Sequence, residues 1–173
     1  MSLARSATPF DPAAAARFIA DPHRTRPPSA NLPEDIAPKT IDEAYAAQEA
    51  LRVLWTPLYG EVGGLKIATT TKVMQALMGI DHPCGGVIYS KRIHQSPATI
   101  RLADHMHVVM ECELAVRVGK TFEPRGTPYT REEVRAAVAE VMPAFELIED
   151  RNADYKSSKA HSLICDNAWN AGI

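Results

Sequence analysis

The stretch HMHVVMECELAVRV, residues 105–118, carries the pattern on which the fold of this chain depends. In a β-strand successive side chains point to opposite faces, so residues two apart share a face. Every second residue from Val108 to Val118 is apolar or a cysteine, whereas Glu111 and Glu113 fall on the other face. We therefore predict a strand whose apolar face packs on the core and whose two acids point the same way.

Two neighbouring carboxylates on one face have two interpretations. Like charges side by side repel unless a cation lies between them, and a hard divalent cation prefers oxygen ligands. Alternatively, Glu111 and Glu113 are solvated on the outer face of an edge strand, since exposed acids are common. This segment alone leaves both interpretations open.

A third acid and a lysine lie on other predicted strands. Glu146 is flanked by Phe145 and Leu147, so in a strand its side chain faces away from theirs. Three carboxylates could converge on Mg²⁺ or Mn²⁺ and leave positions open for water and substrate. Lys66 stands mid-strand just before a helix start, where a lysine near a metal could move protons. Taken singly, each is equally explained as an exposed strand residue.

A competing metal site uses histidines. His105 and His107, followed by Glu111 and Gly119, approximate the first metal motif of the cupins, which are small β-barrels that bind Fe, Mn or Zn. The three side chains share strand parity, so the geometry is possible. Thr99, however, stands where that motif has its leading glycine, and a second cupin motif does not follow. A cupin-like metalloenzyme therefore stays as an alternative.

Composition excludes several functional classes. The 173 residues are 46% hydrophobic and 23% charged, which is typical of one globular domain. A net charge of −2 gives no electrostatic case for nucleic acid or an anionic membrane as partner. No run is long enough to cross a bilayer, and the N-terminal stretch lacks the apolar core of a signal peptide. Cys84, Cys112 and Cys165 share no metal-ligand spacing and indicate reduced thiols in a cytoplasmic protein.

Capping and turn residues outline the other elements. A helix begins at Pro12 behind Asp11, and Thr40 with Glu43 forms a capping-box pattern that opens a helix to about Trp55. We also predict a strand at 65–68, a helix at 71–78 that Gly79 stops, weaker strands at 87–89 and 99–102, a helix from 130 that Pro143 ends, with Val134 and Val141 on its buried face, and a strand over 145–149. This mixture indicates an α+β fold.

Several stretches together resemble the fumarylacetoacetate hydrolase superfamily, in its branch of 2-keto-4-pentenoate hydratases and 4-oxalocrotonate decarboxylases. The resemblance rests on GGLKIATTTKVMQALMGIDHPCGG (63–86), the ECE strand, PAFELIEDR (143–151) and DNAWNAG (166–172), in the family's order, with TIDEAYAAQ (40–48) similar to its helical region. It implies an N-terminal helical region at 1–60 and, at 61–173, a β-rich, barrel-like core similar to the fumarylacetoacetase C-terminal domain, in a single domain overall.

The resemblance also implies a site and its chemistry. Glu111, Glu113 and Glu146 would bind Mg²⁺ or Mn²⁺, and Lys66 and Asp81 would be active-site groups. The implied reaction is a hydratase (lyase) step of aromatic-compound catabolism, in which water adds to a 2-hydroxy-2,4-dienoate or 2-oxo-4-enoate to give a 4-hydroxy-2-oxo acid. A 2-oxo acid decarboxylase of the same family is the first alternative. Family members are homo-oligomers, so the same is expected here.

The sequence departs from the family in two places. Ala68 stands where the commoner segment has glycine, which leaves the substrate open. Family members also continue well beyond DNAWNAG, whereas this chain stops at Ile173, so we expect an open sheet edge and exposed apolar surface there. A truncated, non-catalytic homologue is therefore a further alternative.

Overall fold

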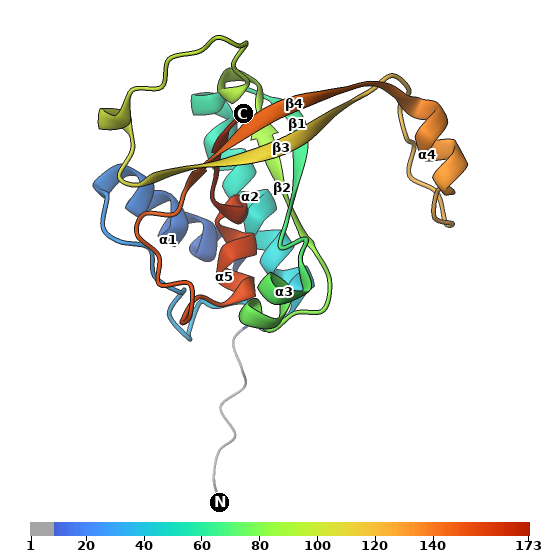
Figure 1. Cartoon of the computed structure of the whole chain (residues 1–173). Helices are drawn as coiled ribbons and strands as arrows, with labels where there is room; N and C mark the ends of the chain where they lie inside the picture. The colour runs from blue at the N-terminus through green and yellow to red at the C-terminus, as the bar shows by residue number, and fades with distance from the viewer. Residues whose placement is uncertain (1–8) are drawn as a thin grey trace, which may run out of the picture.

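Two helices form the layer against which the rest of the chain packs. The computed structural model describes residues 9–173 (Figure 1), so the first eight residues of the predicted helical region 1–60 lie outside the described residues. Helix α1 (Pro12–Thr25) begins behind Asp11, whose side chain accepts the first free backbone N–H groups. Helix α2 (Ile41–Tyr59) begins at Thr40 as predicted but runs one turn further than expected.

A small two-stranded sheet follows α2. Strands β1 (Val62–Ala68) and β2 (Cys84–Tyr89) pair antiparallel, and Lys66 lies opposite Gly86. Between them, α3 (Lys72–Met78) is capped by the side chain of Thr71 and ends at a left-handed glycine, Gly79, as the sequence predicts.

The second sheet has the strand order β3-β4-β5. Strand β3 (Val108–Val118) pairs antiparallel with β4 (Val138–Glu149), with Glu111 opposite Glu146. The short β5 (Asn170–Gly172) adds to the other edge of β4. Past the residues of β4 that pair with β5, strands β3 and β4 extend away from the rest of the molecule as an arm. This arm carries α4 (Arg131–Ala137) near its tip (Figure 1).

The predicted helix over 130–143 is only half present. Its capping box at Thr130 and Glu133 forms, but α4 ends at Ala137 and the next residues continue as β4. The β-branched residues Val138 and Val141 fit a strand at least as well as a helix. Pro143 lies inside β4 opposite Leu114, outside the part of β4 that pairs with β5, so it stands on a sheet edge, where proline is tolerated in strands.

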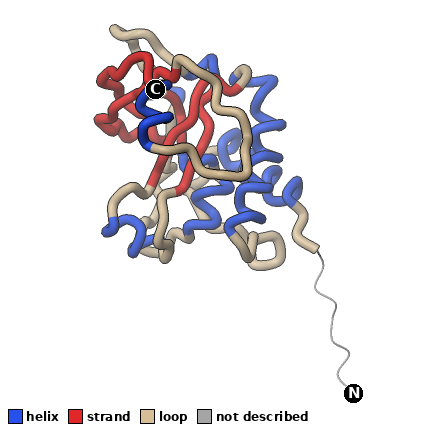
Figure 2. Tube along the Cα trace, turned by 90° about the vertical axis from the view of Figure 1, so that its right-hand side faces the viewer, coloured by secondary structure: helices blue, strands red, loops and turns tan. Residues whose placement is uncertain are grey.

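The core lies between the helices and the inner ends of the strands. Helix α5 (Ala160–Cys165), which the sequence did not predict, packs on α2, and its Ile164 is buried in the same core cluster as Leu51 and Trp55. In the view along the arm, most helical turns lie to one side of the strands (Figure 2). The predicted strand at 99–102 is absent from the described chain; that region is loop with a 3₁₀ turn at Leu102–Asp104.

The prediction that the apolar face of β3 packs on the core is wrong. Met110 is 62% exposed and Leu114 is 74% exposed, and on β4 the neighbouring Phe145 is 56% exposed. Alternation places these side chains on one face correctly, but no layer of the described chain covers that face. Exposure of a contiguous apolar strand face is unusual for a soluble surface.

A mixed helix and strand fold is confirmed, but the described residues form two separate sheets rather than a closed barrel. The chain just after β5 is not left without partners, because Ile173 exchanges backbone hydrogen bonds with Arg92 and His94. Among residues 9–173, no helix combines the length and the apolar character needed to span a bilayer.

Candidate functional site

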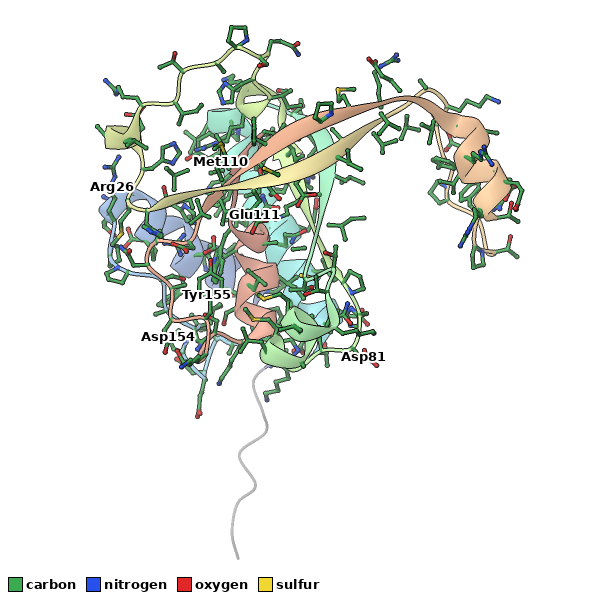
Figure 3. The ribbon with its side chains drawn as sticks, in the orientation of Figure 1. Arg26, Asp81, Met110, Glu111, Asp154 and Tyr155 are labelled. Atoms are coloured by element: carbon green, nitrogen blue, oxygen red, sulfur yellow. The ribbon has the colours of Figure 1, made fainter. Side chains whose placement is uncertain are left out.

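Three carboxylates meet on one face of the β3–β4 pair. Glu111 and Glu113 lie two residues apart on β3, and Glu146 lies opposite Glu111 on β4. One oxygen from each of the three lies within 4.8 Å of the others. We call these residues the acid cluster. Figure 3 shows Glu111 in the body of the molecule, well away from the arm tip.

Lys66 reaches the acid cluster from the other sheet. Its Nζ lies 2.7 Å from Oε1 of Glu146, and both side chains are 6% exposed. The same Nζ donates a hydrogen bond of 3.2 Å to the carbonyl oxygen of Ala168. A buried carboxylate is tolerated only when it is paired and hydrogen-bonded, so Lys66 is what allows Glu146 to be buried as a charge.

A strained turn brings a further group to Glu146. Asn167, Ala168 and Trp169 all have left-handed φ angles, of 51°, 48° and 56°, a conformation that costs energy for residues with a Cβ. We call residues 167–169 the strained turn. It ends at Asn170, whose Nδ2 donates a hydrogen bond of 2.8 Å to the same Oε1 of Glu146.

The strained turn is held against β2 by one side chain. Oδ1 of Asn167 accepts from the backbone N–H of Val87 at 2.7 Å, and its Nδ2 donates to the carbonyl of Val87 at 2.9 Å. Gly86 allows this approach, because a Cβ there would lie 2.8 Å from the carbonyl oxygen of Asn167. Two strands and one clamped turn therefore converge on Glu146.

The electrostatics of the acid cluster favour a proton or a cation. Burial raises the pKa of Glu111 above its usual value of 4.5, and the charges of Glu146 and Glu113 raise it further, whereas Lys66 lowers it. One ammonium faces three carboxylates, so negative charge remains in excess. Oxygen donors with excess negative charge are the ligands that Mg²⁺ and similar hard cations prefer.

The other predicted site residues lie elsewhere. Asp81 is exposed in the turn after α3, and Figure 3 shows it near the lower end of the body, below Glu111 and away from it, so its role stays a prediction. His105 bonds Glu149 through Nδ1 at 2.9 Å, and Nδ1 of His107 bonds Asp150 at 2.6 Å. Neither histidine belongs to the acid cluster.

Asn170 is a contact that sequence reasoning missed. The segment DNAWNAG stood out only through its resemblance, and nothing in its pattern distinguishes Asn170 from Asn167. Its place becomes visible once β5 pairs with β4 and carries its side chain to Glu146.

Comparisons with known proteins found similar enzymes, although no family model matches the chain. The chain is 35% identical over 110 residues to a 4-oxalocrotonate decarboxylase of Pseudomonas sp, covering 64% of this chain and 41% of that protein. It is 29% identical over 161 residues to a 2-keto-4-pentenoate hydratase of Paraburkholderia xenovorans (strain LB400), covering 93% of this chain and 59% of the relative. A 2-oxo-hept-4-ene-1,7-dioate hydratase of Escherichia coli is 33% identical over 139 residues, which are 78% of this chain and 51% of that protein.

These relatives confirm the resemblance of the chain to the hydratase and decarboxylase branch of the fumarylacetoacetate hydrolase superfamily.

A solved structure shares the fold of this branch. The 4-oxalocrotonate decarboxylase from Pseudomonas putida G7, solved with magnesium and adipate, superimposes with a TM-score of 0.82 at 22% identity, over 98% of this chain and 63% of that one. The same enzyme was also solved with calcium and acetate. The chain thus spans about half the length of the curated branch members that it matches.

Proposed function

We propose that this chain carries the metal-binding and proton-transfer groups of a Mg²⁺-dependent hydratase, a lyase that adds water to a 2-hydroxy-2,4-dienoate or 2-oxo-4-enoate. The observation that carries the proposal is the acid cluster, with its three carboxylates within 4.8 Å and Lys66 at 2.7 Å from Glu146. The names of several relatives support the reaction type, among them a 2-hydroxypent-2,4-dienoate hydratase of Pseudomonas putida.

The donor set fits a hard divalent cation. Glu111, Glu113 and Glu146 offer only oxygen ligands, and three protein ligands leave positions for water and substrate. A second observation supports a ligand here: Oδ1 of Asn170, a side chain that is 93% buried, has no partner among the described residues. When bound, Mg²⁺ or Mn²⁺ would polarise the 2-oxo group of the substrate and stabilise the enolate that develops on it.

Lys66 is the group that we assign to proton transfer. Its ammonium is held between Glu146 and the carbonyl of Ala168, so its Nζ has a defined position beside the acid cluster. A cation bound by Glu146 would share that carboxylate with Lys66, so the Nζ of Lys66 would stay beside the bound substrate and could exchange a proton with its carbon. The proposed aromatic-catabolism role rests on this chemistry and on the relatives' names.

A decarboxylase of the same branch is the second candidate, because the relative with the highest of these identities, 35%, is a 4-oxalocrotonate decarboxylase. A decarboxylase uses the same enolate to lose carbon dioxide. The two are distinguished by the products formed from 2-hydroxypenta-2,4-dienoate and from 4-oxalocrotonate.

The first test is thermal unfolding with Mg²⁺, with oxalate and with both. Oxalate resembles the enolate of a 2-oxo acid, so stabilisation by the pair well beyond either alone supports an open metal site. Glu113→Ala should abolish the effect, whereas His105→Ala and His107→Ala should keep it. Absence of any shift in the unsubstituted chain would refute the metal site, and the reverse ranking of the variants would favour the cupin-like alternative.

A further inference from the structure

Only one end of the Asn170 side-chain amide has a hydrogen-bond partner among the described residues. Nδ2 is bound to Glu146, but Oδ1 has no hydrogen-bond partner in the described part of the chain, and the side chain is only 7% exposed. Nearly all buried polar groups in folded proteins have a partner, and an exception needs an explanation. A bound ligand or water that donates a hydrogen bond is such an explanation.

The orientation of this amide follows from chemistry. A carboxylate only accepts hydrogen bonds, so the amino end of Asn170 must face Glu146 and the oxygen must face away from it. The two heteroatoms of an amide are about 2.3 Å apart, so Oδ1 lies no more than about 5 Å from Oε1 of Glu146. Oδ1 is therefore an acceptor held at the edge of the acid cluster.

The backbone that leads into Asn170 is strained. The strained turn, three consecutive left-handed residues, leads directly into Asn170 and also aims the carbonyl of Ala168 at Lys66. Strained backbone persists where the surrounding structure holds it, commonly at functional sites. Here the clamp of Asn167 on Val87 holds it. One rigid turn thus positions both the lysine and the free acceptor against Glu146.

We propose that Oδ1 of Asn170 accepts a hydrogen bond from the water that is added to the substrate, and so orients its oxygen towards carbon. This inference rests on the proposed function. The 2-hydroxy-2,4-dienoate first gains a proton at C5 and loses its enol proton, which gives the 2-oxo-3-enoate. The water oxygen then bonds to C4 while the C3=C4 electron pair moves into the enolate. One water proton stays on the new hydroxyl, the other passes to Lys66, and Lys66 gives a proton to C3 as the enolate returns to the 2-oxo form. Neither an oxidant nor a reductant is needed.

Two isosteric variants separate the two ends of the amide. Asn170→Leu removes both the acceptor and the bond to Glu146. Asn170→Asp keeps an acceptor oxygen but loses the donor to Glu146. If Oδ1 orients water, hydration should fall at least tenfold in kcat in the leucine variant and be largely retained in the aspartate variant. Equal losses in both would assign Asn170 to holding Glu146 only, and would overturn the inference.

A second reaction distinguishes this inference from the proposed function. 2-Oxopentanoate has no C=C bond to which water can add. Exchange of its C3 protons for deuterium in the presence of Mg²⁺, followed by NMR, nevertheless needs the same enolate. We expect exchange in Asn170→Leu to stay within threefold of the unsubstituted chain while hydration of 2-hydroxypenta-2,4-dienoate collapses. Unimpaired hydration in the leucine variant overturns the role of Asn170 alone, whereas absence of exchange and hydration in the unsubstituted chain overturns both proposals.

Binding and folding provide readouts besides turnover. The Mg²⁺ affinity of Asn170→Leu, measured by calorimetry, should stay within threefold of the unsubstituted chain; a loss of tenfold or more would make Oδ1 a metal ligand and overturn the water-orienting role. If the leucine variant does not fold, Asn170→Ala, which removes the acceptor and the donor and adds no bulk, takes its place in every comparison. It should show the same separation of hydration from exchange.

Discussion

Glu111→Gln should make the metal-free protein more stable at neutral pH and weaken its response to Mg²⁺. The acid cluster holds three like charges with oxygens within 4.8 Å, which unfolding releases. Two unit charges at that distance repel by about 0.9 kcal/mol in water and about 3.5 kcal/mol at an effective dielectric constant of 20. Glu111 and Glu113 are exposed residues, and neighbouring atoms shield the Glu111 carboxyl only in part, so screening favours the lower figure. Attraction between Glu111 and Lys66 offsets part of this repulsion. We expect Glu111→Gln to raise the free energy of unfolding by about 1 kcal/mol.

The pH dependence has a definite sign. The pKa of Glu111 is raised in the folded protein, mainly by burial. The folded state then binds this proton more tightly than the unfolded state, so stability falls as the pH rises from the unfolded value of about 4.5 through the folded one. Glutamine does not titrate. The difference between variant and unsubstituted chain should therefore be small near pH 4 and reach its full size by pH 7.

Urea unfolding in EDTA and in Mg²⁺, across that pH range, is the assay. Mg²⁺ should stabilise the unsubstituted chain more than the variant and reverse their order. Glu140→Gln is the matched control, since Glu140 is an exposed acid on the neighbouring strand β4, paired with Arg117 on the arm; it should change neither the pH profile nor the Mg²⁺ response. If Glu111→Gln were less stable than the unsubstituted chain in EDTA at pH 7, the electrostatic reasoning would be refuted.

Other substitutions test the rest of the arrangement. Lys66→Met should cost about 3–5 kcal/mol in chemical denaturation, because it leaves Glu146 buried without its partner; a cost under about 1 kcal/mol would contradict the buried pair. Gly86→Ala should lose about 1–3 kcal/mol and lower Tm by pushing on the strained turn, whereas Gly126→Ala, which meets nothing within 4 Å, should leave Tm unchanged. Leu114→Ser should change the unfolding free energy of the single chain by no more than about 0.5 kcal/mol, since Leu114 is 74% exposed; a loss above about 2 kcal/mol would mean that this face is covered in solution.

The sequence predicted which side chains share a strand face better than it predicted whether that face is buried. Alternation along β3 indicated that Glu111 and Glu113 share a face, and the structure brings Glu146 to them. Alternation does not say which face a second layer covers, because that depends on elements far along the chain. For this reason the apolar residues around Leu114 were expected in the core and lie exposed.

Local signals were reliable where the cause is local. The cap at Thr71 and the stop at Gly79 bound α3 as predicted, because each acts within one helical turn. The boundary between α4 and β4 was missed, since Val138 and Val141 have helical spacing although β-branched residues also favour strands, and only the pairing with β3 decides. Asn170 could not be found this way either, because its partner, Glu146, lies on another strand.

The ion pair between Lys66 and Glu146 has a consequence for how the protein folds. Lys66 and its other partner, Ala168, are 102 positions apart in the chain, and the ion pair links two separate sheets. Contacts of such long range form late in folding, after most of the loop entropy has been lost. During synthesis Lys66 therefore leaves the ribosome well before Glu146 and Ala168, and among the described residues the acid cluster gains the buried charge of Lys66 only when β4 packs against β1. Formation of the acid cluster with its counter-charge thus requires the two sheets to come together.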